Sequence, residues 1–192
     1  MQQDWLSSPF CCYIGYMERQ AHGNRYEDQV IQRITGVSKA HYETLVPGGY
    51  TSIHDLVEGI LTDRNISVKT TCNNTIDCGD ALRRYDHNDY DMIVGVYDKS
   101  GIHTEHTFRI TPDMHHLLWG DITREELAEF VLFVKTIPHG KAAQQATKQE
   151  RETWKKALEA KGGLFRLHAK VDSKKQRRVQ CSLKITQLLS VC

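Results

Sequence analysis

The stretch NISVKTTCNNTIDCGDALRRYD, residues 65–86, decides the fold. It begins with an alternation in which Ile66 and Val68 share one face and Ser67 and Lys69 share the other. A period of two residues is typical of a β-strand, in which alternate side chains point to opposite faces. We therefore expect a serine and a lysine to project together from a strand whose other face packs on a core.

The second half of this stretch predicts a turn and a helix. Asn73 and Asn74 lie in a polar turn, and the acidic residues Asp77 and Asp80 favour the start of a helix that continues through Arg84. A strand that is followed by a turn and a helix is typical of α/β folds.

Periodicity predicts the remaining elements. We expect a helix at 26–35, which ends at Gly36, and a second at 38–45. A third is expected at 122–137, with a capping box of Thr123 and Glu126. A further surface helix should end at Gly162 and Gly163. The expected strands are 90–98 and 103–112, joined as a hairpin, and an alternating stretch through Val179, Cys181 and Leu183. On the helix 26–35, the apolar residues that recur are Val30, Ile31 and Ile34.

Composition excludes several classes of protein. The 25 basic and 24 acidic residues nearly cancel, so a generic polycation that coats nucleic acid is excluded. The N-terminal apolar stretch is interrupted, and no stretch approaches the ~20 apolar residues of a membrane helix, so we expect a soluble, cytoplasmic protein. The six cysteines lack CxxC pairs, and neither His103 with His106 nor His115 with His116 has zinc-site spacing.

The segment 52–61 has two interpretations. As one strand of a hairpin with residues 65–71, it brings Asp55 or Glu58 opposite Lys69, depending on the length of the turn. As a helix capped by Ser52, it matches the i, i+3, i+4, i+7 apolar pattern equally well.

Asp55, the strand ISVKTT and the later apolar strand YDMIVGVY together resemble the core of the PD-(D/E)XK nuclease superfamily, in particular its type II restriction endonucleases. The resemblance covers roughly residues 26–110. It implies an α/β fold with a central mixed β-sheet flanked by helices. We expect a single nuclease domain over 1–192, with its core in 26–137 and a C-terminal helix and basic DNA-contacting segment in 140–192.

The resemblance also implies a site. Asp55 matches the first acid of the family motif and Lys69 matches its lysine, while Ser67 stands where the second acid is usual. Asp80 is our candidate for a carboxylate supplied from the following helix, with Asp77 and Glu58 as alternatives and Glu27 as a supporting residue. Asp55 and Asp80 would then bind Mg²⁺, with the Val68 carbonyl, for hydrolysis that leaves 5'-phosphate ends.

Double-stranded DNA is the expected partner, bound by a homodimer without an organic cofactor or a membrane. The expected contacts are Asn73, Asn74, Arg84, Lys174, Lys175, Gln176, Arg177, Arg178 and Gln180, because amides and arginines suit base edges and lysines suit phosphates. Two alternatives stay open. One is a catalytically inactive nuclease fold that acts as a DNA-binding or regulatory module, and the other is a small interaction domain with no nucleic-acid role.

Overall fold

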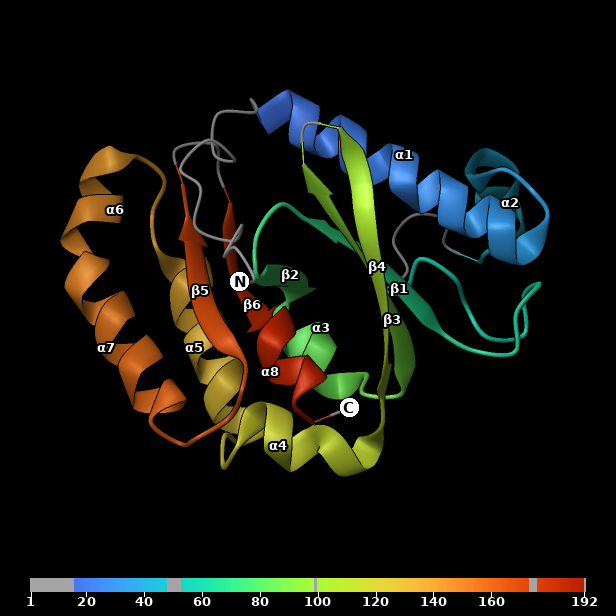
Figure 1. Ribbon diagram of the computed structural model, residues 1–192. Coiled ribbons are helices and arrows are strands. Elements are labelled where there is room, and N and C mark those ends of the chain that lie inside the picture. Colours follow the sequence, from blue (N-terminus) through green and yellow to red (C-terminus); the bar gives the residue numbers. More distant parts are fainter. Residues whose placement is uncertain (1–15, 48–52, 99, 173–175, 192) are drawn as a thin grey trace, which may run out of the picture. The chain divides into compact units, whose positions relative to one another are not determined.

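The computed structural model describes residues 16–47, 53–98, 100–172 and 176–191, so Ser52, Lys174 and Lys175 lie outside the described residues. The chain divides into two compact units (Figure 1). The first consists of Met1–Ile76, Asp89–Ile110 and Leu188–Cys192, and the second of Asp77–Asn88 and Thr111–Gln187.

Two helices open the first unit, and both predictions are confirmed. Helix α1 spans Tyr16–Thr35 and ends before Gly36, whose φ of 78° lies in the left-handed region that favours glycine. Helix α2 spans Lys39–Leu45, and Ser38 caps it by accepting a hydrogen bond from the His41 N–H.

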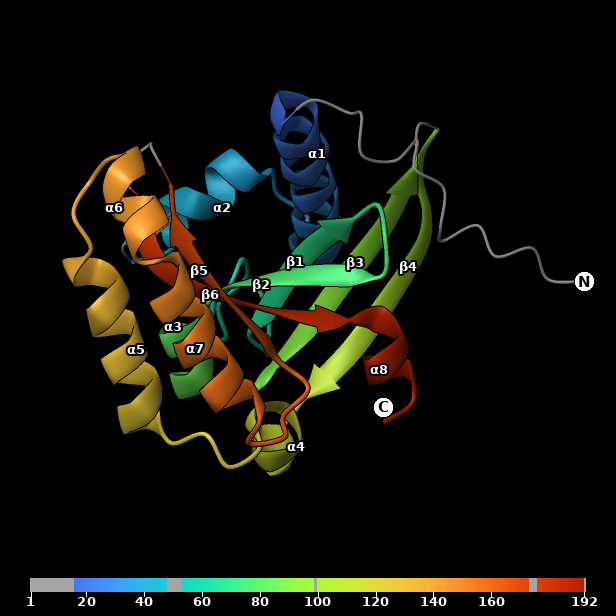
Figure 2. The same ribbon diagram turned by 90° about the vertical axis from the view of Figure 1, so that its left-hand side faces the viewer.

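The first unit contains a three-stranded mixed sheet in the order β1-β3-β4. Strand β1 (Ile66–Thr71) runs parallel to β3 (Tyr90–Asp98), and β3 forms an antiparallel hairpin with β4 (Gly101–Ile110). The strand predicted around Lys69 and the predicted hairpin are therefore confirmed. Figure 2 shows these three strands side by side.

The core of this unit forms between α1 and the sheet. Its members are apolar and buried: Tyr26, Val30, Ile31, Tyr42, Leu56, Ile66, Val68 and Ile93. Tyr26, one turn before Val30, completes the buried face of α1, whereas Ile34 is 36% exposed. The helix therefore buries a stripe that lies one turn earlier than the expected one.

The predicted helix start at Asp77 is wrong. Residues Thr75–Asp80 form strand β2, in which Ile76 and Cys78 are buried while Asp77 is exposed. This alternation buries one face of a strand, and burial outweighs the preference of acidic residues for a helix N-terminus. Helix α3 (Ala81–Asp86) starts afterwards, and Asp80 is its N-cap.

The strands form two three-stranded sheets, not the single central sheet that we expected, although the mixed α/β character is confirmed. The second sheet has the order β2-β6-β5, and β5 (Arg166–Val171) pairs antiparallel with β6 (Arg177–Lys184). The strand predicted from Val179, Cys181 and Leu183 is present and all three are buried, but Gln180 and Ser182 between them are buried as well, so β6 buries both of its faces.

The second unit also holds most of the helices: the 3-10 turn η4 (Pro112–Met114), α4 (His115–Trp119), α5 (Arg124–Thr136), α6 (Lys141–Ala146), α7 (Lys148–Glu159) and α8 (Ile185–Leu189), which ends in the first unit. The capping box of Thr123 and Glu126 is confirmed on α5. The expected long surface helix is two helices that meet at Thr147. Within the described residues, no helix combines the length and apolar character needed to cross a membrane.

Candidate active site

Asp55 reaches β1 because the residue that follows it pairs with the start of that strand. Leu56 and Ile66 form an isolated antiparallel bridge, with N–H to carbonyl distances of 3.0 and 2.8 Å. The described part of 52–61 contains no helix, and beyond the bridge it forms turns rather than a regular hairpin. Glu58, the alternative acid, is exposed, and its N–H donates to the side chain of Asn65.

One oxygen of Asp55 meets three consecutive residues of β1. Asp55 Oδ2 accepts a hydrogen bond from the Val68 N–H at 2.6 Å, lies 3.4 Å from Ser67 Oγ, and lies 3.7 Å from Lys69 Nζ. Charge-assisted bonds of this kind are shorter and stronger than neutral ones. The strand therefore holds the carboxylate in one orientation and pairs it with the lysine. The predicted grouping of Asp55, Ser67 and Lys69 is observed.

Ser67 contributes to this arrangement from the interior. Ser67 is completely buried, and its hydroxyl oxygen lies 3.4 Å from Asp55 Oδ2. A hydroxyl is a poor ligand for a hard cation compared with a carboxylate. The position of Ser67 suits orienting Asp55 rather than binding a metal.

Glu27 on α1 joins the same cluster. It forms an ion pair with Lys39 at 2.8 Å, and it is close enough to Asp55 and Lys69 to interact with both electrostatically. Burial, followed by the negative charge of Asp55, raises the pKa of Glu27 above its ordinary 4.5, although Lys39 and Lys69 oppose the shift. Two carboxylates therefore lie in one partly buried cluster, where the charge of Asp55 disfavours ionisation of Glu27.

The sequence pattern carried a signal for Glu27 that we interpreted only as a supporting role. Glu27 precedes Val30 and Ile31 by three and four residues, so it lies on the buried face of α1. An acidic residue on the apolar face of a helix requires a compensating partner. Its partners come from α2 and β1, which sequence spacing alone does not bring together.

The two carboxylates of Asp55 and Glu27 are enough for a magnesium ion, but they do not form a complete set of protein ligands. The described residues hold no group of three or more His, Cys, Asp or Glu side chains arranged to bind a metal. Mg²⁺ is usually bound by one or two carboxylates, with water and substrate phosphate completing its octahedron. Asp55 and Glu27 supply that number of carboxylates, and all three contacts of Asp55 given above use Oδ2.

Asp80 and Asp77 are engaged locally in the second unit. Asp80 Oδ1 accepts from the Arg83 N–H at 3.0 Å and caps α3. Asp77 Oδ1 accepts from the Gly79 N–H at 2.9 Å. Asp55 and Lys69 belong to the first unit, and within that unit Glu27 is the acid that interacts electrostatically with both.

The predicted DNA-contacting residues lie in different environments. Asn73 is exposed in the turn after β1, and Asn74 beside it is partly buried. Arg84 and Gln180 are buried, with 4% and 7% exposure. Arg178 on β6 is exposed and lies opposite Lys170, whereas Gln176 is partly buried. Contact with DNA stays a prediction for this set.

Arg177 has a clear structural role. Its guanidinium donates hydrogen bonds to the carbonyls of Ile137, Pro138, Asp172 and Gln176, at 2.5 to 3.0 Å. These bonds fasten the segment after α5 to the start of β6. Reading a base edge would require breaking them.

Comparison of the chain with models of known protein families, with curated proteins and with solved structures finds no match. The cluster around Asp55 and Lys69 is therefore the feature from which function is inferred.

Proposed function

We propose that the protein is a magnesium-dependent DNA endonuclease with its active centre at Asp55, Lys69 and Glu27. The observation that carries the proposal is the contact of one Asp55 oxygen with both the Val68 N–H and the Lys69 ammonium group. An acid and a lysine held on one strand, with a second acid beside them, form a minimal set for hydrolysis of a phosphodiester.

Each side chain has a role in this proposal. Asp55 and Glu27 would hold the cation, whose positive charge would oppose the burial and the Asp55 charge that raise the pKa of Glu27. Lys69 would stabilise the negative charge that develops on the phosphate. The Val68 N–H and Ser67 hydroxyl keep Asp55 oriented for both tasks.

The magnesium ion would polarise the phosphate and lower the pKa of a bound water. The residues of the chain hold the cation, orient Asp55 and stabilise the charge on the phosphate. Lys39 neutralises Glu27 at 2.8 Å, so the cluster of two acids and two lysines is balanced without a cation. A cation would displace Lys39 or Lys69 from its partner, and we expect millimolar rather than micromolar magnesium to be required.

One feature of the first unit supports a restriction-endonuclease-like fold for the proposed enzyme. Helix α1 precedes the lysine-bearing strand β1, and the chain passes through β2 and α3 before it returns to β3, which lies parallel to β1. A mixed sheet with the lysine-bearing strand at its edge and a helix before it is consistent with the resemblance to PD-(D/E)XK nucleases. Double-stranded DNA as substrate, 5'-phosphate products and a homodimer that matches a palindromic site belong to the same proposal.

The test is cleavage of plasmid DNA by the full chain with Mg²⁺ and, in parallel, with EDTA. We expect cleavage only with Mg²⁺, and loss of at least about 100-fold in rate for Lys69→Ala and for Asp55→Asn, on the scale of removing one charge-stabilising group. The control is Lys161→Ala, because Lys161 also forms an ion pair with a carboxylate, that of Glu126, but in the other unit. Undiminished cutting by Lys69→Ala would refute the site.

A catalytically inactive DNA-binding module is the second candidate, and two observations favour it. Ser67 replaces the usual second acid, and the lysines already neutralise both carboxylates. A gel shift without cleavage at any magnesium concentration would select this alternative. Discrete fragments would identify a sequence-specific endonuclease, and random nicking a nonspecific one.

A further inference from the structure

A pocket of about 460 Å³ lies on the first unit between α1 and the turn that joins β3 to β4. Helix α1 contributes His22, Arg25, Tyr26 and Gln29, and residues 100–102 form the opposite wall. The helical residues are three or four positions apart, so they share one face of α1. The pocket is therefore built by two adjacent elements of one unit.

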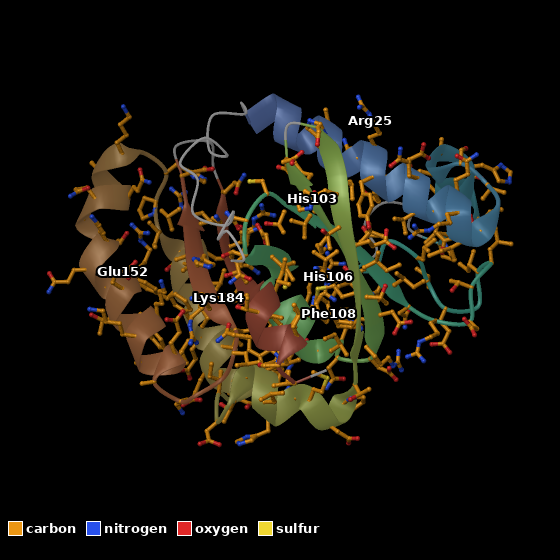
Figure 3. All side chains as sticks on the ribbon, viewed as in Figure 1. Arg25, His103, His106, Phe108, Glu152 and Lys184 are labelled. Atoms are coloured by element: carbon orange, nitrogen blue, oxygen red, sulfur yellow. The ribbon has the colours of Figure 1, made fainter. Side chains whose placement is uncertain are left out.

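Two of the polar side chains that line this pocket are available to a ligand. Among the residues that the structure describes, neither the Arg25 guanidinium nor the Gln29 amide has a hydrogen-bond or ion-pair partner. Arg33, two turns further along α1, differs because it binds Glu105 at 2.9 and 3.0 Å. Arg25 is exposed and extends away from the helix (Figure 3). Two donors are thus available to a ligand.

The charge around the pocket favours an anion. Among the described residues that line it, Arg25 is the only formally charged one and none is a carboxylate. On the adjoining strands, Asp98 accepts both hydrogen bonds of Ser100, and the charge of Glu105 is paired with Arg33. An arginine with a neighbouring amide is the donor pair that commonly binds phosphate oxygens.

The pocket also offers an aromatic surface. The His22 ring stacks on Tyr97 with centroids 5.4 Å apart and planes inclined by 15°. Tyr97 is buried and His22 is partly exposed, so the imidazole is the outer ring of the stack. Rings of this kind stack on nucleic acid bases regardless of sequence.

The pocket lies further along the sheet from the candidate active site. Lys69 is paired with Val94, and Tyr97 is three residues beyond Val94 on β3. At a rise of about 3.3 Å per residue, this separation is roughly 10 Å, or about three nucleotides along one strand of a duplex. Glu27 of the site directly follows Tyr26 of the pocket on α1.

We infer that this pocket binds one phosphate-bearing nucleotide of a nucleic acid strand, a few positions from the phosphate to be cut. Arg25 and Gln29 bind the phosphate, and the base lies beside His22. The inference rests on the proposed function, because it assigns a substrate contact to the same unit.

The test measures binding and cleavage separately. Fluorescence anisotropy with a duplex oligonucleotide, over a series of salt concentrations, compares Lys69→Ala with Lys69→Ala/Arg25→Ala. We expect the second protein to bind about tenfold more weakly and its log–log salt slope to be smaller by about 1. His22→Ala should weaken binding by about fivefold or more without changing the slope. Equal affinity and equal slope for all of them would overturn the inference.

Arg33→Ala is the matched control, because Arg33 lies on the same helix but is paired with Glu105. It should leave the salt slope unchanged. Thermal melting verifies that each variant is folded, and Gln29→Ala provides a second pocket variant.

A titration with deoxythymidine monophosphate distinguishes the source of the ligand. Saturable, Arg25-dependent binding of this mononucleotide, with DNA affinity independent of Arg25, would assign the pocket to free nucleotides and overturn the strand inference.

Failure of the two proposals can be told apart. If the wild type never cuts DNA but binds it through Arg25, the nuclease proposal fails and the binding of a strand phosphate by the pocket stands. If the wild type cuts DNA and Arg25→Ala has the same KM and kcat, the pocket inference fails and the nuclease proposal stands. The supporting result is a raised KM with an unchanged kcat.

Discussion

The ring of Tyr26 lies directly against the backbone of Gly95. A Cβ atom at residue 95 would be 2.7 Å from Tyr26 Cζ and 2.8 Å from Tyr26 Cε1. The Tyr26 hydroxyl then donates a 2.5 Å hydrogen bond to Glu105, which is paired with Gly95 on the neighbouring strand. Glycine at this position allows α1 to approach the sheet, and the approach brings Glu27, the next residue, to the candidate active site.

Gly95→Ala should therefore destabilise the protein. The added methyl group would also come within 2.9 Å of Ile102 Cδ1, so it must displace a buried ring or a neighbouring side chain. Overpacking of this kind costs about 1–3 kcal/mol. Urea unfolding measures the loss.

Gly23→Ala is the matched control on α1. Its Cβ atom would lie 3.5 Å from Thr70 Oγ1, which is an ordinary contact. Alanine is favoured over glycine in a helix interior by up to about 1 kcal/mol. We expect an unchanged or higher free energy of unfolding, and a loss equal to that of Gly95→Ala would contradict the packing explanation.

Glu105 should make stability depend on acid pH. Burial alone would raise its pKa, but hydrogen bonds from Tyr26 and Arg33 outweigh burial and lower it below the ordinary 4.5. A lowered pKa in the folded state stabilises the protein above pH 4.5, and this contribution disappears as the pH falls through the folded-state value. Glu105→Gln should thus be less stable than the wild type at pH 7, and the difference should shrink in unfolding experiments below pH 4.5. A difference that does not vary with pH would argue against this assignment.

Glu27→Gln should behave in the opposite way. The pKa of Glu27 is raised, first by burial and then by Asp55, so its contribution favours the folded state at low pH and is lost as the pH rises above 4.5. The neutral amide should increase the free energy of unfolding at pH 7 relative to the wild type. Under the proposed function the same change should abolish cleavage, as expected where a functional site opposes stability. Chemical denaturation at pH 4 and pH 7 measures the free energy of unfolding of both proteins. A Glu27→Gln protein that is less stable than the wild type at pH 7 would refute the prediction.

Ser67→Ala should separate orientation from metal binding. The Ser67 hydroxyl lies 3.4 Å from Asp55, whereas the stronger 2.6 Å bond comes from the Val68 N–H, which the substitution leaves in place. We expect a loss in kcat of about tenfold or less, compared with at least about 100-fold for Asp55→Asn. The magnesium concentration for half-maximal activity should be unchanged in Ser67→Ala. A large rise in that concentration would instead make Ser67 a ligand.

Local signals account for the elements that were predicted correctly. The capping box of Thr123 and Glu126 lies within four consecutive residues, and both of its hydrogen bonds are present on α5. The apolar run of β3 and its hairpin with β4 likewise depend on neighbouring residues. The segment around Asp77 was predicted as a helix start but is a strand, because Ile76 and Cys78 alternate with exposed residues and are buried on one face.

The sequence by itself determined the lysine-bearing strand, its serine and lysine, and the helices with strong caps, because those depend on side-chain period and on contacts a few residues apart. Only the tertiary structure decided that Asp55 meets that strand through a single bridge, that Glu27 completes the cluster, and that the strands divide into two sheets. These features depend on contacts between residues far apart along the chain, and their choice is settled by which apolar faces can be buried together.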